Sequence, residues 1–362
     1  MASIANDNIV AAADAGVHAV AGGAGAEVVD IHPALTPFVI TAATVTDIGG
    51  YHRNEDRAFI KSDATVAGVF DGHGTYGAEI AQWTLEWIST HPDAVLNAET
   101  FATIDAHLRE RMGAHLTEKG VPFFQKEGAF YQMSYLSTLP LRGGTTGTMV
   151  HVNADDGSVI AAHVGDSEVR VFDRNSVDHD ICADHTATSF EEYHRIRASH
   201  PSAKFVCDGG PPWVAPRPVF EQKPDGTIEL NPAGPYKFCD VRGSWGAYLR
   251  MPDDSESLAM TRALGDFNLK RLAGVTAEPH CKTVEAPPVD VKERNIVVAS
   301  DGFWDILHYS EVSEKLWSAE TAEEKVRVLM EFAKEKTIER LGSPGDNITI
   351  VVVCLKRDAS SD

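Results

Sequence analysis

The chain has 362 residues, of which 43% are hydrophobic and 23% are charged. This balance is typical of a soluble globular protein that is long enough to bury a full core. Its 53 acidic and 32 basic residues give a formal charge of −21. That charge argues against nucleic acid as a partner, because binding to its backbone depends on clustered Lys and Arg. No run approaches the roughly 20 apolar residues of a membrane-spanning helix, so we expect no membrane partner.

The cysteines and the N-terminal segment bear on the compartment. The five cysteines are Cys182, Cys207, Cys239, Cys281 and Cys354. Their odd number and wide spacing, without the rhythm of metal ligands, predict reduced thiols in a cytosol-like compartment. The Ala- and Gly-rich stretch 9–25 contains Asp14 and His18 and follows no basic segment, so it is unlike a secretion signal. We expect a cytoplasmic protein, with the nucleus as the alternative.

The chain divides into one domain with two flanks. Residues 1–36 are rich in Ala and Gly and show no sustained period, which predicts a mobile or loosely docked extension. Patterned sequence occupies residues 37–357, and residues 358–362 form a short tail. Within the domain, residues 209–257 are rich in proline and glycine and lack a long period, so we expect a functional lid or a partly structured insertion there.

The first half of the domain alternates between strand-like and helix-like patterns. β-Branched residues predict strands over residues 38–46 and 65–70. Apolar residues three and four positions apart predict helices from about Gly77 to His91 and over residues 99–119. In the irregular segment that follows, we expect a short helix near residues 131–136.

The second half begins with a hairpin turn at Asp155-Asp156-Gly157, between two apolar runs. A helix is expected to end at His200, because a proline follows it. A long helix is expected over residues 320–341, and a last strand over residues 348–355.

Acidic residues recur where apolar runs stop. They are Glu55, Asp56, Asp71, Asp166, Asp301 and Asp346. The strand that ends at Phe70, for example, is followed directly by Asp71-Gly72-His73. A single Asp-Gly is most often only a turn. Repetition at several strand ends favours a shared cleft instead, because such ends open away from the core and are candidates for chemistry.

A cluster of carboxylates needs cations. Two unit charges about 4 Å apart repel by roughly 4 kcal/mol at an effective dielectric constant near 20. Oxygen ligands, without Cys or His at metal-ligand spacing, favour Mg²⁺ or Mn²⁺. A carboxylate shared by two such ions roughly 3.5–4 Å apart is typical of phosphate-ester hydrolysis, because a bridging water becomes hydroxide while both ions neutralise phosphate oxygens.

Eight short motifs stand in order along the chain. They are Asn54-Glu55-Asp56, Phe70-Asp71-Gly72-His73-Gly74, Gly143-Gly144-Thr145-Thr146, Val164-Gly165-Asp166-Ser167, Asp184-His185, Thr261-Arg262-Ala263-Leu264-Gly265-Asp266, Ser300-Asp301-Gly302-Phe303-Trp304-Asp305 and Gly345-Asp346-Asn347. Each motif alone is weak. In this order and at this spacing, the chain resembles the metal-dependent protein phosphatases of the PP2C (PPM) family from about Phe38 to Lys356.

The resemblance implies an α+β fold, a four-layer α-β-β-α sandwich of two stacked antiparallel sheets flanked by helices. It implies hydrolysis of phosphoserine and phosphothreonine in phosphorylated protein substrates, with Mg²⁺ or Mn²⁺ as two bound ions and a weaker third. A monomer is the family default.

The resemblance also implies the ligands of these ions. Asp71 bridges the two ions. Glu55 and the backbone carbonyl of Gly72 hold one of them, and Asp301 and Asp346 hold the other.

Three further residues acquire roles from the resemblance. Asp56 orients the attacking water, and Asp166, with Asp301, matches the weaker third-ion site. His73 resembles the general acid that protonates the departing serine or threonine oxygen, a role that suits the near-neutral pKa of histidine.

One departure from the family pattern concerns the substrate phosphate. Family members usually carry an arginine four residues before the glutamate, and here that position is Tyr51. Arg53 stands two residues before Glu55. In an extended segment residues 51, 53 and 55 share a face, so our hypothesis is that Arg53 binds the phosphate; the alternative is an ordinary surface arginine.

A second departure is the long stretch 209–257, which corresponds to the family's flap beside the active site and is enlarged. Our hypothesis is that it selects the protein substrate through Trp213, Trp245 or Arg242. The alternative is an insertion without a role in recognition.

Two other function classes stay open at this point. A pseudophosphatase would keep the fold and bind phosphoproteins as a regulatory module without turnover, which the altered arginine position favours. The retained Glu55, Asp71, Asp301 and Asp346 argue against it, because mutually repelling acids serve no purpose without ions. A metal-dependent nuclease is disfavoured by the charge of −21.

Overall fold

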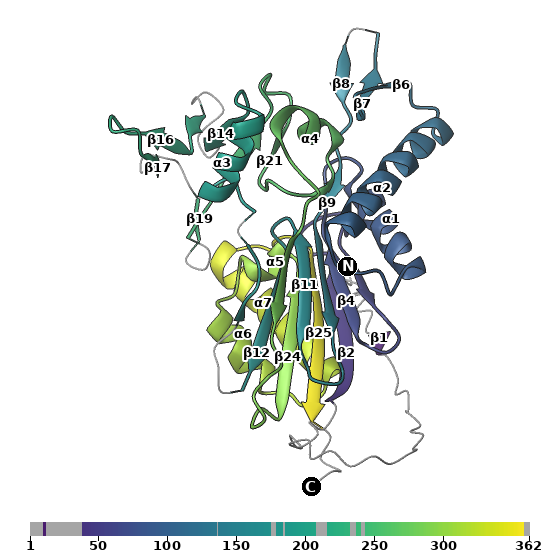
Figure 1. Cartoon of the computed structure of the whole chain (residues 1–362), viewed down its shortest axis with the longest axis vertical. Coiled ribbons are helices and arrows are strands. Elements are labelled where there is room, and N and C mark those ends of the chain that lie inside the picture. Colours follow the sequence, from purple (N-terminus) through teal and green to yellow (C-terminus); the bar gives the residue numbers. More distant parts are fainter. Residues whose placement is uncertain are drawn as a thin grey trace, which may run out of the picture.

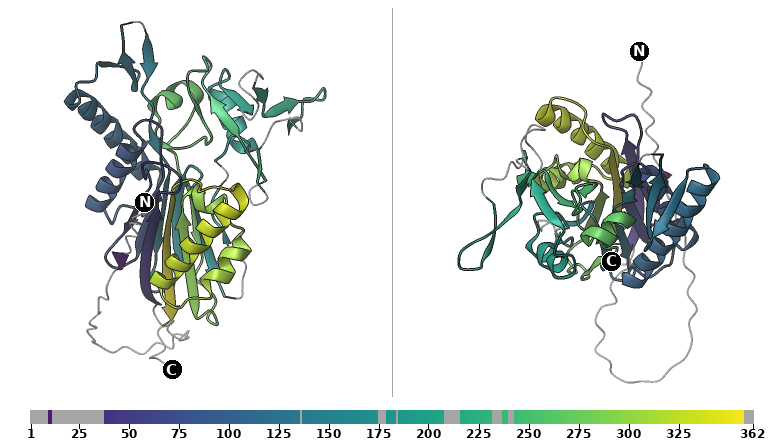
Figure 2. Two further views of the ribbon diagram at one scale, coloured as in Figure 1. Left: turned by 180° about the vertical axis from the view of Figure 1, so that it is seen from behind. Right: turned by 90° about the horizontal axis from the view of Figure 1, so that it is seen from above.

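The computed structural model describes residues 10–11, 38–135, 137–174, 179–183, 185–207, 216–231, 237–239 and 243–357. Two antiparallel sheets are stacked face to face, and helices cover both outer faces (Figure 1). Seen from above, the blue helices of the first half of the chain and the yellow-green helices of its end lie on opposite sides of the strands (Figure 2). The predicted four-layer α-β-β-α sandwich is confirmed.

The strands of the two sheets come from distant parts of the chain. The six-stranded sheet has the order β1-β2-β25-β24-β12-β13, and the five-stranded sheet the order β23-β11-β10-β4-β3. The first is built from β1 (Val10–Ala11), β2 (Phe38–Asp47), β12 (Glu168–Asp173), β13 (His179–Asp180), β24 (Glu293–Ala299) and β25 (Ile348–Arg357). The second is built from β3 (Arg57–Ile60), β4 (Val66–Phe70), β10 (Gly147–Val152), β11 (Val159–Val164) and β23 (His280–Val284).

β25 lies inside the six-stranded sheet, and side chains on both faces of this strand are buried. Both faces therefore need cover, which helices provide on one side and the second sheet on the other. Side chains alternate between the faces of a strand. Val351 and Val353 therefore pack between the two sheets, whereas Ile350 and Val352 pack against the helices. An unbroken apolar run in the sequence thus becomes the centre of the sandwich.

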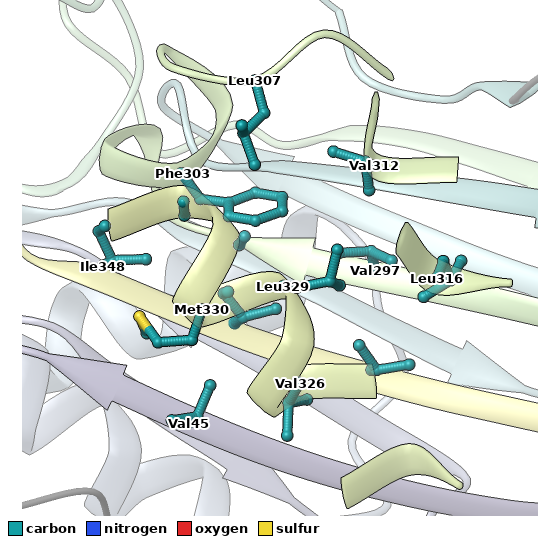
Figure 3. Packing of buried hydrophobic residues seen from close by; sticks show 14 of the residues in the cluster. Val45, Val297, Phe303, Leu307, Val312, Leu316, Val326, Leu329, Met330 and Ile348 are labelled. Carbon is teal, nitrogen blue, oxygen red and sulfur yellow. The ribbon is translucent and has the colours of Figure 1, made fainter. Parts of the chain in front are cut away.

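Five helices form the outer layers. They are α1 (Gly77–Thr90), α2 (Ala98–Glu118), α5 (Asp301–Trp304), α6 (Tyr309–Leu316) and α7 (Ala322–Leu341). Leu329 and Met330 of α7 point toward the strands that carry Val45 and Val297 (Figure 3). The predicted helices at residues 77–91, 99–119 and 320–341 are confirmed, and each of their ends differs from the prediction by at most two residues.

A smaller subdomain stands above one end of the sandwich (Figure 1). Its members are α3 (Phe190–Ser199), α4 (Phe267–Ala273), β14 (Lys204–Cys207), β15 (Arg217–Pro218), β16 (Phe220–Gln222), β17 (Ile228–Leu230), β18 (Lys237–Cys239), β19 (Gly243–Trp245), β20 (Ala247–Arg250) and β21 (Ser257–Leu258). It has its own apolar core, so the described part of the predicted insertion is packed. Trp213, Arg242 and the side chain of Trp245 lie outside the described residues.

The prediction of a short helix near residues 131–136 is wrong. This part of the chain forms a three-stranded sheet of β6 (Phe123–Lys126), β7 (Ala129–Met133) and β8 (Thr138–Pro140). Glu127 and Gly128, both with positive φ, make a two-residue turn between β6 and β7. Phe124 stacks on Tyr131 across the two strands at 5.2 Å between ring centroids, and such cross-strand aromatic pairs stabilise a hairpin.

The flanks of the domain are described only in part. Val10–Ala11 pair with Ala43 and Thr44 at the edge of the six-stranded sheet. The rest of the predicted extension over residues 1–36 and the predicted tail over residues 358–362 lie outside the described residues. Among the helices of the described ranges, none combines the length and the apolar character needed to cross a membrane.

Candidate active site

The antiparallel pairing of the strands brings the acidic ends together. The C-terminal end of β4 lies beside the N-terminal end of β3, with Phe70 opposite Arg57. The C-terminal end of β24 lies beside the N-terminal end of β25, with Ala299 opposite Ile350. Acids that follow one strand and precede the next therefore meet at the same end of the sandwich.

A cleft of about 520 Å³ lies at this end. Eight of the nine predicted site residues line it, namely Arg53, Glu55, Asp71, Gly72, His73, Asp166, Asp301 and Asp346. The ninth, Asp56, is only 3% exposed, and its Oδ2 accepts a hydrogen bond of 2.8 Å from the Ser300 hydroxyl. The structure thus collects residues from both sheets around one cavity.

Local contacts hold Glu55 and Gly72 in place. The side-chain oxygen of Asn347 accepts a hydrogen bond of 2.8 Å from the backbone N–H of Glu55, and its Nδ2 donates to the carbonyl of Ile48. A Cβ on Gly72 would lie 2.5 Å from the carbonyl oxygen of Gly77, so only glycine fits here.

Burial and mutual repulsion make the anionic cluster unfavourable by itself. Burial raises the pKa of Asp71 well above its ordinary value, and repulsion from Asp56 and Asp301 raises it further. Burial raises the pKa of Asp56 to about 6, although the hydrogen bond from Ser300 opposes this shift. A bound cation would reverse both effects, because it favours the charged form of a carboxylate.

The donor set fits hard divalent ions. Oδ1 of Asp301 and Oδ1 of Asp56 are buried and have no hydrogen-bond partner in the described structure. All acidic groups of the cleft offer oxygen, the donor that Mg²⁺ and Mn²⁺ prefer. Among the described residues, however, no three His, Cys, Asp or Glu side chains already form a group that could hold an ion. Carboxylates that come closer together repel one another unless a cation lies between them.

His73 is paired with an aspartate from a distant part of the chain. Its Nε2 donates a hydrogen bond of 2.6 Å to Oδ2 of Asp266, whereas its Nδ1 is buried and has no partner in the described structure. Burial lowers the pKa of His73, but the charge and hydrogen bond of Asp266 outweigh it, so that the net pKa is raised. The geometry leaves Nδ1 as the nitrogen that can give a proton to a ligand.

Gly144 makes the contact between His73 and Asp266 geometrically feasible. It lies in the middle of a small sheet of β5 (Gly72–His73), β9 (Gly144–Thr145) and β22 (Leu264–Gly265). His73 pairs with Gly144 on one side and Gly265 pairs with it on the other. A Cβ on Gly144 would lie 2.1 Å from Oδ2 of Asp266 and 2.6 Å from Nε2 of His73, so any side chain there would separate the two.

Arg53 reaches the cleft but is engaged with two acids. Its Nη2 lies 2.9 Å from Oε2 of Glu79 on α1, and its Nε lies 4.0 Å from Oε1 of Glu55. Its side chain is 49% exposed, and Tyr51, also exposed, lines the cleft beside it. Arg53 could therefore bind a phosphate only if its guanidinium left Glu79 or contacted Glu79 and the phosphate together.

Three residues of the site had no role in the sequence interpretation. Asp266, Ser300 and Asn347 all stand inside motifs that carried the family resemblance. Their contacts to His73, Asp56 and Glu55 show why those motifs extend beyond the predicted ligands.

Comparison with protein families identifies the class. The family model described as Protein phosphatase 2C matches residues 52–207 and 239–340. The chain belongs to the protein phosphatase 2C family. The match leaves out residues 208–238, and all of these except residue 208 lie in the insertion predicted from the sequence.

Curated relatives carry the same family name or a related one. Protein phosphatase 1K, mitochondrial, of Xenopus laevis is 26% identical over 313 residues, which cover 85% of this chain and 66% of that protein. Probable protein phosphatase 2C 52 of Arabidopsis thaliana is 25% identical over 335 residues, which cover 84% of this chain and 62% of that protein. The chain thus spans about two thirds or less of the length of these relatives.

Solved structures share the fold. Serine-threonine phosphatase 2C from Toxoplasma gondii superimposes with a TM-score of 0.56 at 18% identity, covering 90% of this chain and 99% of that one. The catalytic domain of the serine threonine protein phosphatase PstP, in complex with two manganese ions, gives a TM-score of 0.50 at 19% identity, covering 88% of this chain and 99% of that one.

Proposed function

We propose that this protein hydrolyses phosphoserine and phosphothreonine esters in proteins, using water activated between two divalent ions. The single observation that supports this most strongly is the cleft that Glu55, Asp71, Asp301, Asp346 and His73 share. Membership of the protein phosphatase 2C family and the manganese ions of PstP support the same reading.

The proposed ligands are those that the resemblance to the family implies, and all of them line the cleft. Asp71, which is repelled by Asp301 and Asp346, would contribute its carboxylate to the ions. Glu55 and the carbonyl of Gly72 would hold one ion, and Asp301 and Asp346 the other. When bound, the ions supply an activated water and neutralise phosphate oxygens. Mg²⁺ and Mn²⁺ both suit these donors, and Asp166 would contribute to a weaker third site.

The side chains themselves position the water and deliver the proton. Asp56 is buried and accepts a hydrogen bond from Ser300, and it would orient the attacking water. As the water oxygen bonds to phosphorus and the bond to the serine or threonine oxygen breaks, Nδ1 of His73 would give its proton to that oxygen. Asp266 would accept the hydrogen bond from Nε2, so that this proton stays on the ring. Its charge would stabilise the protonated imidazole before the transfer.

A binding module without turnover is the second candidate. The engagement of Arg53 by Glu79 and the tyrosine at position 51 favour it, because no uncommitted arginine lines the described part of the cleft. The buried, partnerless carboxylate oxygen of Asp301 opposes it, because without an ion this arrangement only costs stability. We therefore propose an active enzyme acting on phosphorylated proteins, and a cytoplasmic monomer remains a prediction.

The proposal is tested by hydrolysis of a phosphothreonine peptide with Mn²⁺, with Mg²⁺ and with EDTA. We expect turnover with either ion and none with EDTA. Asp301→Asn should lower turnover by about a hundredfold or more, because disturbing even the outer partners of a metal ligand costs 10- to 100-fold. Asp290→Asn is the matched control, since Asp290 is exposed and precedes the opposite end of β24. A folded protein that binds the peptide but hydrolyses none of it with any ion would be a binding module instead.

A further inference from the structure

Asp105 is a buried carboxylate that lies outside the catalytic cleft. It sits in the middle of α2, only 7% exposed, on a helix that covers the five-stranded sheet. Its Oδ1 accepts a hydrogen bond of 2.9 Å from the backbone N–H of Gly265, and the same oxygen accepts from Nζ of Lys270 on α4. Its Oδ2 lies 3.5 Å from Nη2 of Arg109. α2 is thereby tied to the turn that follows β22.

That turn has an unfavourable backbone conformation. Gly265 has φ of 79° and Asp266 has φ of 46°, so two consecutive residues are left-handed. Glycine adopts this conformation readily, but aspartate adopts it at a cost. Asp105 holds the N–H of Gly265, and the carbonyl of Gly143 accepts a hydrogen bond of 2.8 Å from the N–H of Asp266. The two contacts bind the two consecutive backbone N–H groups of the turn.

The conformation of the turn decides where the Asp266 side chain points. Held as it is, Asp266 reaches across Gly144 to Nε2 of His73 at 2.6 Å. Removing the acceptor on Asp105 would leave a buried N–H on Gly265 and a poorly compensated Lys270. We expect the left-handed turn to relax in response, because the N–H of Gly265 and Nζ of Lys270 could then find new hydrogen-bond partners.

We propose that Asp105 is a positioning residue for His73, acting through the Gly265–Asp266 turn. Asp105 touches neither the cleft nor the proposed ions. This inference rests on the proposed function, in which His73 protonates the leaving oxygen.

The choice of substrate separates positioning from general structural damage. A threonine oxygen is a poor leaving group and needs the proton of His73, whereas the nitrophenolate of p-nitrophenyl phosphate leaves without one. Asp105→Ala should lower kcat on a phosphothreonine peptide by about tenfold to a hundredfold, which is part of the full effect of general acid catalysis. It should change kcat on p-nitrophenyl phosphate by less than about twofold and leave KM for the peptide unchanged.

Two further variants make the test specific. Asp105→Asn keeps an oxygen for the N–H of Gly265 and should restore most of kcat on the peptide, even though it weakens the pair with Lys270. Glu293→Gln is the matched control, because Glu293, like Asp105, pairs with a lysine; its partner is Lys325 on α7, on the opposite side of the sandwich. It should lower the thermal midpoint without changing the ratio of the two activities.

A spectroscopic readout decides the positioning independently of turnover. In protein labelled with ¹⁵N-histidine and saturated with Mg²⁺, the Nε2 proton of His73 should give a downfield signal that disappears in His73→Gln. Asp105→Ala should shift or remove this signal, and Asp105→Asn and Glu293→Gln should keep it. An unchanged signal in Asp105→Ala, or equal losses on both substrates, would overturn the inference. If the natural chain hydrolyses neither substrate, the proposed function fails, and the signal still decides whether Asp105 positions His73.

Discussion

His73 is held by a hydrogen bond at one ring nitrogen and has no hydrogen-bond partner at the other in the described structure. Asp266 occupies Nε2, and Nδ1 is the nitrogen without a partner in the described structure. The absent side chain of Gly144 is what allows this contact, since a Cβ would collide with both groups. Asp266 therefore raises the pKa of a histidine whose pKa burial alone would lower, which suits the proposed role of proton donor.

The proposed binding of the substrate phosphate by Arg53 can be tested with a single substitution. If it binds the substrate phosphate, Arg53→Ala should raise KM for a phosphothreonine peptide by about tenfold to a hundredfold, because a charged hydrogen bond contributes about 1.5–3 kcal/mol. Turnover at saturation should fall much less. Steady-state kinetics measure both constants.

A second surface arginine provides the control for that prediction. Arg111 also pairs with a glutamate of α1, Glu86, but lies outside the cleft, so Arg111→Ala should leave KM unchanged. An unchanged KM in Arg53→Ala would return Arg53 to the ordinary surface arginines.

The positions of the predicted acids could be inferred from the sequence, whereas the contacts of the residues that support them could not. The position of Glu55, Asp71, Asp301 and Asp346 at one cleft could be predicted, because each stands beside an apolar run and inside a short motif. Asp105 falls on the apolar face of α2, between Phe101 and Leu108, but its contact could not be predicted because Gly265 lies 160 positions away. Pairing across such distances is set by the packing of whole elements.

At the scale of elements, an ion-pair network joins α3 to the segment that leads to β22. Glu192 of α3 is 1% exposed and accepts hydrogen bonds from Arg195 and from Arg262, each at 2.7 Å from Nη2. Burial by itself would raise the pKa of Glu192, but the two arginines outweigh it and lower the pKa to about 2. The network therefore stabilises the fold only while Glu192 is charged.

This network predicts how stability depends on pH. In the unfolded chain Glu192 would titrate near its ordinary pKa of 4.5. Its contribution is fully present above pH 4.5 and is lost as pH falls toward 2, because the unfolded state takes up the proton first. Glu192→Gln should cost about 3 kcal/mol near neutral pH, because it removes the buried carboxylate that compensates two half-buried arginines.

Thermal midpoints of the natural chain and Glu192→Gln, compared from pH 7 to pH 3, measure this effect. The difference between them should shrink below pH 4.5. Glu191→Gln is the control, because Glu191 is the exposed neighbour on the same helix and should change the midpoint little. A difference that stays constant with pH would show that the charge of Glu192 is not what stabilises the segment.

The main strands and helices could be predicted because their apolar periods are long. α1, α2, α7, β2 and β25 all lie where the patterns place them. The sheet of β6, β7 and β8 was missed because its turn is Glu127-Gly128 rather than the common Asn-Gly or Asp-Gly, and because its strands are short. The pairing of Phe124 with Tyr131, which contributes to its stability, forms only once the strands face each other.

In the whole molecule, the sandwich brings acidic residues together at one of its ends. Antiparallel strands place the end of one beside the beginning of the next, so acids scattered from position 55 to position 346 face a single cleft. The apolar core between the sheets fixes these ends relative to one another. Divalent cations are the natural complement of such a site in a chain of charge −21.

The most direct test of this account is the anomalous scattering of manganese in crystals grown with Mn²⁺. We expect two peaks in the cleft, separated by roughly 3.5–4 Å, with Asp71 between them and Asp301 and Asp346 beside one of them. Ordered manganese elsewhere on the molecule, or a cleft without peaks at saturating Mn²⁺, would contradict the claim that the strand ends form a two-ion site.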